Sequence, residues 1–351
     1  MRLPLAAQLI DLIKATGLRL AQQPHAPVTR KDPRRRLSLA LQGGGSFGAF
    51  TWGVLHRLLD EENLVLDVVS GASAGAVNAV VLASGLANGG PPEAQRRLER
   101  FWRRASEAAP PSKAGAALAA ATRVLSPYQF NPFNVNPLRT ILSEEIDFDA
   151  LRAKPSLRLL IAATRVRDGK LHIFREKSLT LDVVLASACL PVLHHAVSIE
   201  GEAYWDGGYT ANPPLIPLVL GSRASEALIV QIIPSVGGEM PTTASGIARR
   251  MEQITFNSSL LRDLDSLDAM MRLSDPSVKG TRLSRKIRKF HLHHLSAEAE
   301  FPALREASAL NLDWRFLTRL RDAGMRAADR WLSENPRISA DGHSHGDGSG
   351  A

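Results

Sequence analysis

Leu66-Asp67-Val68-Val69-Ser70-Gly71-Ala72-Ser73-Ala74-Gly75-Ala76-Val77-Asn78-Ala79 is the stretch that decides the fold of this 351-residue chain. An apolar run leads into Gly-x-Ser-x-Gly, and a helix pattern of small residues follows. Gly71 and Gly75 flank Ser73 at two residues on either side, a spacing typical of a tight turn from a strand into a helix. Such a turn exposes the serine hydroxyl at the positive end of a helix, where it could act as a nucleophile. The alternative is a turn that only packs the helix on a sheet.

A second glycine-rich turn precedes the first. Residues 37–42 alternate like a strand and run into Gly43-Gly44-Gly45-Ser46-Phe47-Gly48, before a predicted helix over residues 49–61. Successive backbone N–H groups at a helix N-terminus bind anions. The loop lacks the Gly-Lys-Ser/Thr of a phosphate loop, and its Gly-x-Gly-x-x-Gly spacing lacks the later acidic residue of a dinucleotide site. An oxyanion hole is the third interpretation. It is favoured because both turns would lie at the carboxyl edge of one sheet.

Three motifs in register resemble the patatin-like phospholipase family. They are the glycine loop at residues 43–48, the Gly71–Gly75 motif and Asp206-Gly207-Gly208, with Ala186–Pro191 as a further matching segment. The resemblance covers about residues 37–235. It implies an α/β fold, a three-layer α/β/α patatin-like sandwich with a mostly parallel central sheet. Phe47 departs from the family, which often carries Arg or Lys there, and this departure removes a cation from the expected site.

The resemblance also implies the chemistry. It assigns Ser73 as the nucleophile and Asp206 as its base, a dyad without histidine that cleaves carboxylic esters of lipids through an acyl-serine intermediate. No metal and no cofactor are expected. The residues implied to support the dyad are the oxyanion-hole residues Gly43, Gly44, Gly45 and Ser46, and the motif glycines Gly48, Gly71, Gly75, Gly207 and Gly208.

Other functions remain open from the sequence. An α/β-hydrolase triad would need His291, His293 or His294 as its base, although three histidines in one strand are more simply sheet residues. A non-catalytic lipid-binding or scaffold protein could use the same fold. The ester could also be something other than a phospholipid, such as a storage polyester or a thioester.

The composition predicts that a partner is anionic but does not identify that partner. Lys and Arg number 43 against 35 Asp and Glu, a net charge of +8. This sign favours acidic substrates or an anionic membrane surface, with peripheral contact through an N-terminal helix or the basic run at residues 282–289. No nucleic acid is expected, and the protein is expected to be cytoplasmic because no apolar run is long enough to span a membrane.

The domain organisation is expected to follow the motifs. Residues 1–36 are predicted to form an N-terminal helix and a basic linker, and residues 37–235 the catalytic domain. Residues 85–156 form either a lid-like insertion or a plain helical connection. A helical C-terminal extension over residues 236–338 would pack on the catalytic domain, and residues 339–351 would be disordered. The single cysteine, Cys189, is expected in the core.

Overall fold

The computed structural model describes residues 35–109, 124–153, 155–236, 239–273 and 282–336. The predicted N-terminal helix, the Ala-rich segment 114–121 and the predicted tail lie outside the described residues. The described chain forms an eight-stranded sheet in the order β5-β6-β3-β2-β1-β7-β8, with β4 paired to β3. The strands are β1 (Arg35–Leu41), β2 (Leu64–Gly71), β3 (Arg158–Arg165), β4 (Lys170–Arg175), β5 (Val197–Ile199), β6 (Glu202–Asp206), β7 (Glu226–Gln231) and β8 (His291–Ser296).

Strand direction divides this sheet into two parts. Strands β3, β2, β1, β7 and β8 are parallel to their neighbours, whereas β4, β5 and β6 form antiparallel pairs on the β3 side. The predicted mostly parallel central sheet is therefore confirmed. Parallel strands are usually buried on both faces, which explains why β1 and β7 read as nearly continuous apolar runs.

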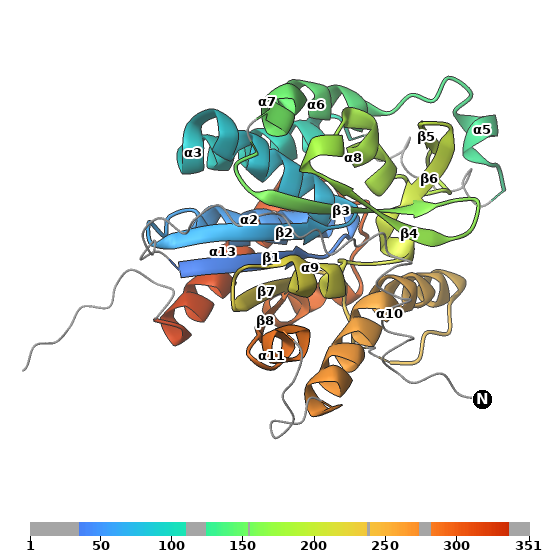
Figure 1. Cartoon of the computed structure of the whole chain (residues 1–351). Helices are drawn as coiled ribbons and strands as arrows, with labels where there is room; N and C mark the ends of the chain where they lie inside the picture. Colours follow the sequence, from blue (N-terminus) through green and yellow to red (C-terminus); the bar gives the residue numbers. More distant parts are fainter. Residues whose placement is uncertain (1–34, 110–123, 154, 237–238, 274–281, 337–351) are drawn as a thin grey trace, which may run out of the picture.

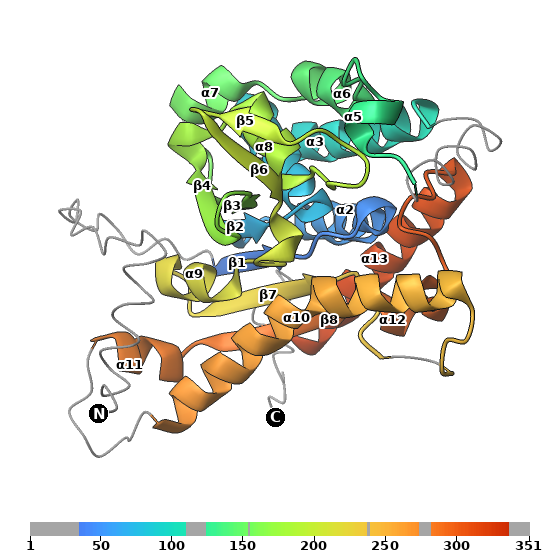
Figure 2. The same cartoon turned by 90° about the vertical axis from the view of Figure 1, so that its right-hand side faces the viewer.

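Helices cover both faces of the sheet and produce the predicted three-layer α/β/α sandwich (Figures 1 and 2). Alternation along β1 shows the division: Leu39 and Leu41 enter the core on one face, and Ala40 enters the core on the other. The first face is covered by α2 (Gly48–Leu58), α3 (Ala74–Glu107), α6 (Pro137–Glu145), α7 (Phe148–Ala153), α8 (Leu181–Ser187) and α13 (Trp314–Glu334). The second is covered by α9 (Leu215–Gly221), α10 (Ala244–Leu273) and α11 (Arg282–Arg288).

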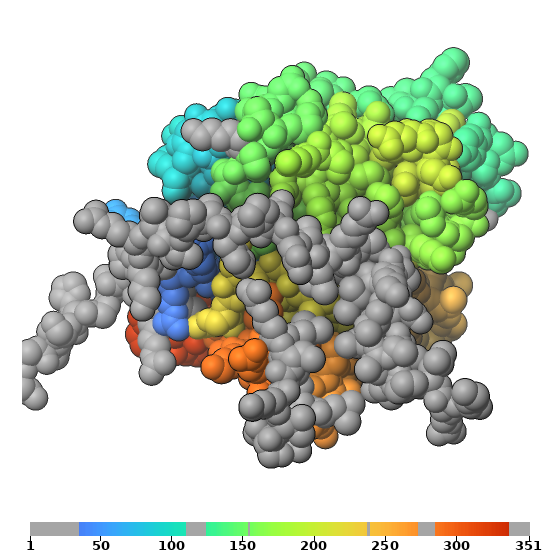
Figure 3. Space-filling view, viewed as in Figure 1, coloured from blue at the N-terminus to red at the C-terminus, as the bar shows by residue number. Residues whose placement is uncertain are grey.

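The segment predicted as a lid-like insertion is largely helical where it is described. Helix α3 continues to Glu107 across a kink at Gly89 and Gly90, where the backbone leaves helical geometry before Pro91 and Pro92. The short α5 (Pro127–Phe130) follows, and α6 and α7 then return to pack on α3. In the space-filling view α6, α7 and α8 form one continuous surface (Figure 3). Opening of this segment as a lid stays a prediction.

The residues after 235 contribute more than helices. Strand β8 pairs in parallel with β7 and extends the sheet, so the strand expected around the three histidines belongs to the central sheet. Helix α13 packs closely on α2, and the Phe316 ring lies 6.3 Å from the ring of Phe47. Phe47 is therefore a buried core residue that contacts α13, which accounts for an apolar residue at this position. A domain boundary at residue 235 stays a prediction.

Several basic residues of the predicted linker and basic run have structural partners. Strand β1 begins at Arg35, two residues earlier than predicted, and Arg35 donates to Glu226 at 2.6 Å. The Nζ atom of Lys286, in α11, donates to the carbonyls of Leu220 and Ser222 at the end of α9. Within the described ranges, no helix combines the length and apolar character needed to cross a membrane.

Candidate active site

The strand register brings the three predicted motifs to one level of the sheet. Leu41 pairs with Gly71, and Gly71 pairs with Ile161. Two residues further along, the chain reaches Gly43 after β1 and Ser73 after β2. Asp206 arrives from the opposite direction, because β6 is antiparallel to β3 and Asp206 pairs with Ala163. The motifs therefore meet at the carboxyl edge of the parallel strands, as expected for an α/β sheet.

Ser73 occupies a strained turn between β2 and α3. Its backbone has φ 52° and ψ −127°, an unusual conformation for a residue with a side chain. A Cβ atom on Gly71 would meet Gly75 at 2.6 Å, so neither glycine leaves room for a larger residue. The Ser73 N–H donates to the carbonyl and hydroxyl oxygens of Ser187 at the end of α8. The turn has the geometry of a nucleophile elbow.

Asp206 ends β6 as a fully buried carboxyl group. Its backbone N–H donates to the Cys189 carbonyl at 2.8 Å, and its Oδ1 atom accepts from the Gly208 N–H at 2.7 Å. Burial raises the pKa of Asp206 to about 7, against the lowering effects of the Gly208 N–H and the Ser73 hydroxyl. The buried Oδ2 atom has no partner in full hydrogen-bond geometry among the described residues. The Oδ2 atom of Asp206 is therefore available to accept a hydrogen bond from the Ser73 hydroxyl.

The glycines after Asp206 let the loop enter a crowded space. A Cβ atom on Gly207 would meet the carbonyl of Ala162 in β3, and one on Gly208 would meet the Phe256 ring at 2.5 Å. Gly48 is similarly close to Ala74, at the start of α3. The predicted motif glycines therefore all lie where a Cβ atom would meet a neighbouring residue.

The residues predicted to form the oxyanion hole differ in whether their backbone N–H groups already have acceptors. The Gly43 N–H already donates to Asn212 Oδ1 at 2.6 Å, and the Ser46 N–H donates to the Ala309 carbonyl at 2.8 Å. Both donors are therefore engaged in other hydrogen bonds, and their part in an oxyanion hole stays a prediction. The N–H groups of Gly44 and Gly45 have no acceptor within the part of the chain that the structure describes. These two groups remain as candidate donors to an oxyanion.

Two residues near the site were not predicted to have a role. Ser187 accepts the Ser73 N–H, and Asn212 bonds the glycine loop. Asn212 follows Asp206 by six residues, and the sequence indicated only the end of a loop there. A polar residue before two prolines gives no sign that it is buried, so only the fold reveals these contacts.

The histidines of the alternative triad lie on the edge strand β8. His293 Nε2 bonds Glu226 Oε2 at 3.1 Å, and His294 Nε2 bonds Gln231 Oε1 at 2.7 Å. His291 is exposed. In the described part of the chain, no hydrogen bond or ring contact joins these histidines to Ser73 or Asp206. The geometry therefore favours a dyad over a triad. Nor does any group of three or more His, Cys, Asp or Glu within the described ranges form a candidate metal site.

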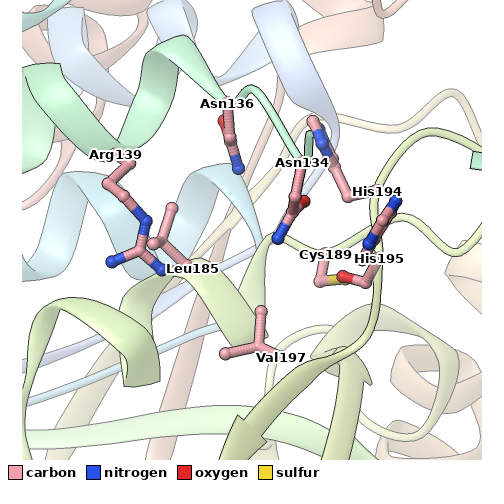
Figure 4. A pocket seen from close by; sticks show the side chains of 8 residues that line it. All are labelled: Asn134, Asn136, Arg139, Leu185, Cys189, His194, His195 and Val197. Atoms are coloured by element: carbon pink, nitrogen blue, oxygen red, sulfur yellow. The ribbon is translucent and has the colours of Figure 1, made fainter. Parts of the chain in front are cut away.

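A small polar hollow lies next to the Asp206 loop (Figure 4). It has a volume of about 20 Å³, and its lining includes Arg139, Cys189, His194 and His195. The Cys189 thiol donates to the His195 carbonyl at 3.1 Å, and burial raises the pKa of this thiol to about 12. Cys189 is thus an unreactive buried residue, as expected. The hollow has room for about one water molecule and none for an acyl chain.

Exposed apolar side chains lie on α10, on the Asp206 loop and on the segment after Ala309, and we call Tyr209, Ile247, Met251, Ile254 and Leu310 the apolar rim. Three of them recur at helical spacing along α10, which crosses the molecule beside β7 (Figure 2). The Tyr209 ring packs 5.1 Å from the ring of Phe256 in α10. Leu310 follows Ala309, whose carbonyl contacts the glycine loop. Tyr209 thus lies in the Asp206 loop, and Leu310 lies next to the residue that bonds the glycine loop.

Comparison with known proteins places these motifs in one family. The patatin-like phospholipase family model matches residues 39–219. Among solved structures, VipD from Legionella pneumophila is 18% identical at a TM-score of 0.36, covering 83% of this chain and 67% of its own. The type III effector protein ExoU is also 18% identical at a TM-score of 0.28, covering 88% of this chain and 66% of its own. These scores are too low to bear on the site. No curated protein matches the chain.

Proposed function

This chain belongs to the patatin-like phospholipase family, a family of lipid hydrolases, and on that basis we propose that it is a serine hydrolase that cleaves carboxylic esters of lipids through Ser73 and Asp206. The observation that carries the proposal is the meeting of a strained serine with a buried, incompletely bonded carboxyl group at one sheet edge. Family membership alone would leave the reacting residues unassigned, because function depends on the site.

The first half of the reaction uses the serine as the nucleophile. The ionised Asp206 carboxylate removes the hydroxyl proton while Ser73 Oγ attacks the ester carbonyl. The N–H groups of Gly44 and Gly45 stabilise the negative charge on the carbonyl oxygen. The tetrahedral intermediate then collapses, the leaving alcohol takes the proton from Asp206, and the acyl group stays on Ser73.

The second half removes the acyl group with water. Asp206 takes a proton from the water, which attacks the acyl carbonyl, and the same backbone donors stabilise the second oxyanion. Ser73 leaves as the alcohol and recovers its proton from Asp206. A single carboxylate therefore serves both halves, and neither half needs a histidine or a metal.

The substrate is reached at the surface of a lipid aggregate, and the apolar rim supports this part of the proposal. Met251 is 63% exposed and Leu310 is 59% exposed. Transfer of large apolar side chains out of water is favourable, so their exposure is typical of a contact surface. Two arginines of this region are paired with carboxylates: Arg249 pairs with Glu306, and Arg305 pairs with Glu298. Insertion of these apolar side chains therefore contributes to the contact with lipid.

The proposal is tested by hydrolysis of short- and long-chain p-nitrophenyl esters and of phospholipid vesicles. Wild type should cleave them, whereas Ser73→Ala and Asp206→Asn should each lose about 10³-fold or more. Ser70→Ala is the matched control, because Ser70 is a buried serine in β2 whose hydroxyl lacks a described partner. A fluorophosphonate probe should label wild type and not Ser73→Ala. Activity that survives Ser73→Ala would contradict the mechanism, and activity lost in His293→Ala or His294→Ala would favour a triad.

A further inference from the structure

We propose that Asn212 is a positioning residue that fixes the direction of the oxyanion-hole donors, an inference that rests on the proposed function and deepens it. Asn212 is fully buried, although an asparagine side chain in the interior requires hydrogen-bond partners. Its partners belong to segments far apart in sequence. The role follows from which groups those partners are.

The side chain holds both backbone groups of Gly43. Asn212 Oδ1 accepts the Gly43 N–H at 2.6 Å, and Asn212 Nδ2 donates to the Gly43 carbonyl at 3.1 Å. Two bonds to one residue fix both its position and its orientation. Gly43 is followed directly by Gly44 and Gly45, whose N–H groups are the remaining donors, so the orientation of Gly43 sets where those donors point.

Asn212 is itself held in place by α10. Its Nδ2 atom also donates to the Phe256 carbonyl at 3.0 Å, and its backbone N–H donates to the Ser259 hydroxyl at 2.9 Å. The side chain thus uses its acceptor once and its amino group twice, with every polar group satisfied. This rigid support is what a pre-organised group of oxyanion donors needs, because small displacements of such donors weaken catalysis strongly.

The position of Asn212 also connects the two halves of the candidate site. It follows Asp206 in the same loop and bonds the loop that lies against Ser73. The distance between the base and the oxyanion donors is therefore set by one short segment and one side chain. Removing that side chain should displace the donors without altering Ser73 or Asp206.

Asn257 provides a matched control. It is also a buried asparagine, it bonds the side chains of Gln42 and Gln231 and the Pro234 carbonyl, and it makes no hydrogen bond with residues 43–45. Replacing either asparagine removes a similar number of buried hydrogen bonds. The experiment compares Asn212→Ala and Asn212→Ser with Asn257→Ala and Asn257→Ser, and the thermal midpoint of each variant is measured first.

The expected result separates positioning from stability. In the Asn212 variants kcat for a p-nitrophenyl ester should fall about 10- to 100-fold with KM within about twofold. Affinity for a trifluoromethyl ketone, which forms a tetrahedral oxyanion with Ser73, should fall by a similar factor. Asn257 variants of equal thermal midpoint should keep kcat within about threefold of wild type. Asn212→Ser, the milder change, covers the case in which Asn212→Ala does not fold.

Three results would overturn the inference. Folded Asn212 variants could keep wild-type kcat, the Asn257 variants could lose as much, or kcat could fall while affinity for the ketone is unchanged. These outcomes leave the proposed function intact if wild type shows activity that depends on Ser73. A wild type that neither cleaves esters nor reacts with the fluorophosphonate would instead reject the proposed function, and the inference with it.

Discussion

A Cβ atom added to Gly43 would lie 2.6 Å from the Cβ atom of Ser73. The glycine loop and the turn that carries the candidate nucleophile are therefore in direct contact. We predict that Gly43→Ala lowers kcat at least about 100-fold, because the loop must move away from Ser73 and take its donors with it. Gly221→Ala is the control, since a Cβ atom there would meet nothing within 4 Å. Equal activity in the two variants would show that this contact is not needed for catalysis.

The backbone of Ser73 predicts a difference between two inactive variants. Its φ of 52° strains any residue with a side chain, whereas glycine adopts such angles freely. Both Ser73→Ala and Ser73→Gly remove the hydroxyl, but only Ser73→Gly relieves the strain. We expect Ser73→Gly to have the higher free energy of unfolding, by about 1 kcal/mol, in urea titrations. A lower stability of the glycine variant would contradict a strained turn.

The pH dependence of activity should report the ionisation of Asp206. The carboxyl must be ionised to accept the Ser73 proton, and burial raises its pKa to about 7. We therefore expect kcat/KM to rise with pH up to about pH 7 and then level off. The measurement is a pH–rate profile with a soluble ester. A profile already flat at pH 5 would place another group, or a much less buried carboxylate, in this role.

The same shift predicts that ionised Asp206 destabilises the folded protein. Below its unfolded-state pKa of about 3.8 the carboxyl is protonated in both states, so its ionisation costs no stability. Between pH 3.8 and about 7 it is ionised only when unfolded, and each pH unit lowers the free energy of unfolding by about 1.4 kcal/mol. Above pH 7 the cost is complete, with an upper bound of about 4 kcal/mol. Asp206→Asn should remove it.

The measurement is urea unfolding of wild type and Asp206→Asn from pH 4.5 to 8.5. The stability gained by the variant should grow with pH up to about pH 7 and stay constant above it. Comparison with wild type at each pH cancels the contributions of other buried acids such as Asp263. A gain that does not change with pH would show that Asp206 has an ordinary pKa.

The apolar rim predicts a substrate-dependent loss of activity. Met251→Ser combined with Ile254→Ser should lower hydrolysis of phospholipid vesicles about tenfold or more. The substitutions remove apolar area that would otherwise transfer from water into the lipid. Hydrolysis of a soluble short-chain ester should not change. Met271→Ser is the control, since Met271 is exposed near the other end of α10. Equal losses on both substrates would mean that the rim supports the fold rather than a lipid contact.

The sequence could predict those parts of the site that depend on local backbone geometry. Gly71 and Gly75 indicate the turn at Ser73, because a strand followed within two residues by a helix requires small neighbours. Apolar runs indicated the parallel strands, and the order of motifs indicated their common edge. The start of α2 differs because a short 3-10 turn at Gly45–Phe47 precedes it. Local patterns thus predicted the elements better than their ends.

Contacts between distant residues could not be predicted in the same way. Asn212 and Gly43 are 169 residues apart, and no local pattern indicates their bond. The engaged N–H group of Ser46 depends on the Ala309 carbonyl, from a segment whose path the sequence does not reveal. The histidines at 291, 293 and 294 were expected to lie in a strand, as they do in β8, but its parallel pairing with β7 follows only from the fold. Such features depend on topology rather than on residue type.

The parallel pairing of β1 with β7 has a consequence for any shortened form of this protein. The matched family segment ends at residue 219, before β7 begins. A chain cut there would turn β1 into an unprotected edge strand and would lose the α10 backbone that supports Asn212. Unpaired edges of apolar strands promote pairing between copies of the chain. The region that identifies the family is therefore smaller than the region that can fold autonomously, and truncation to it should yield aggregate rather than a minimal enzyme.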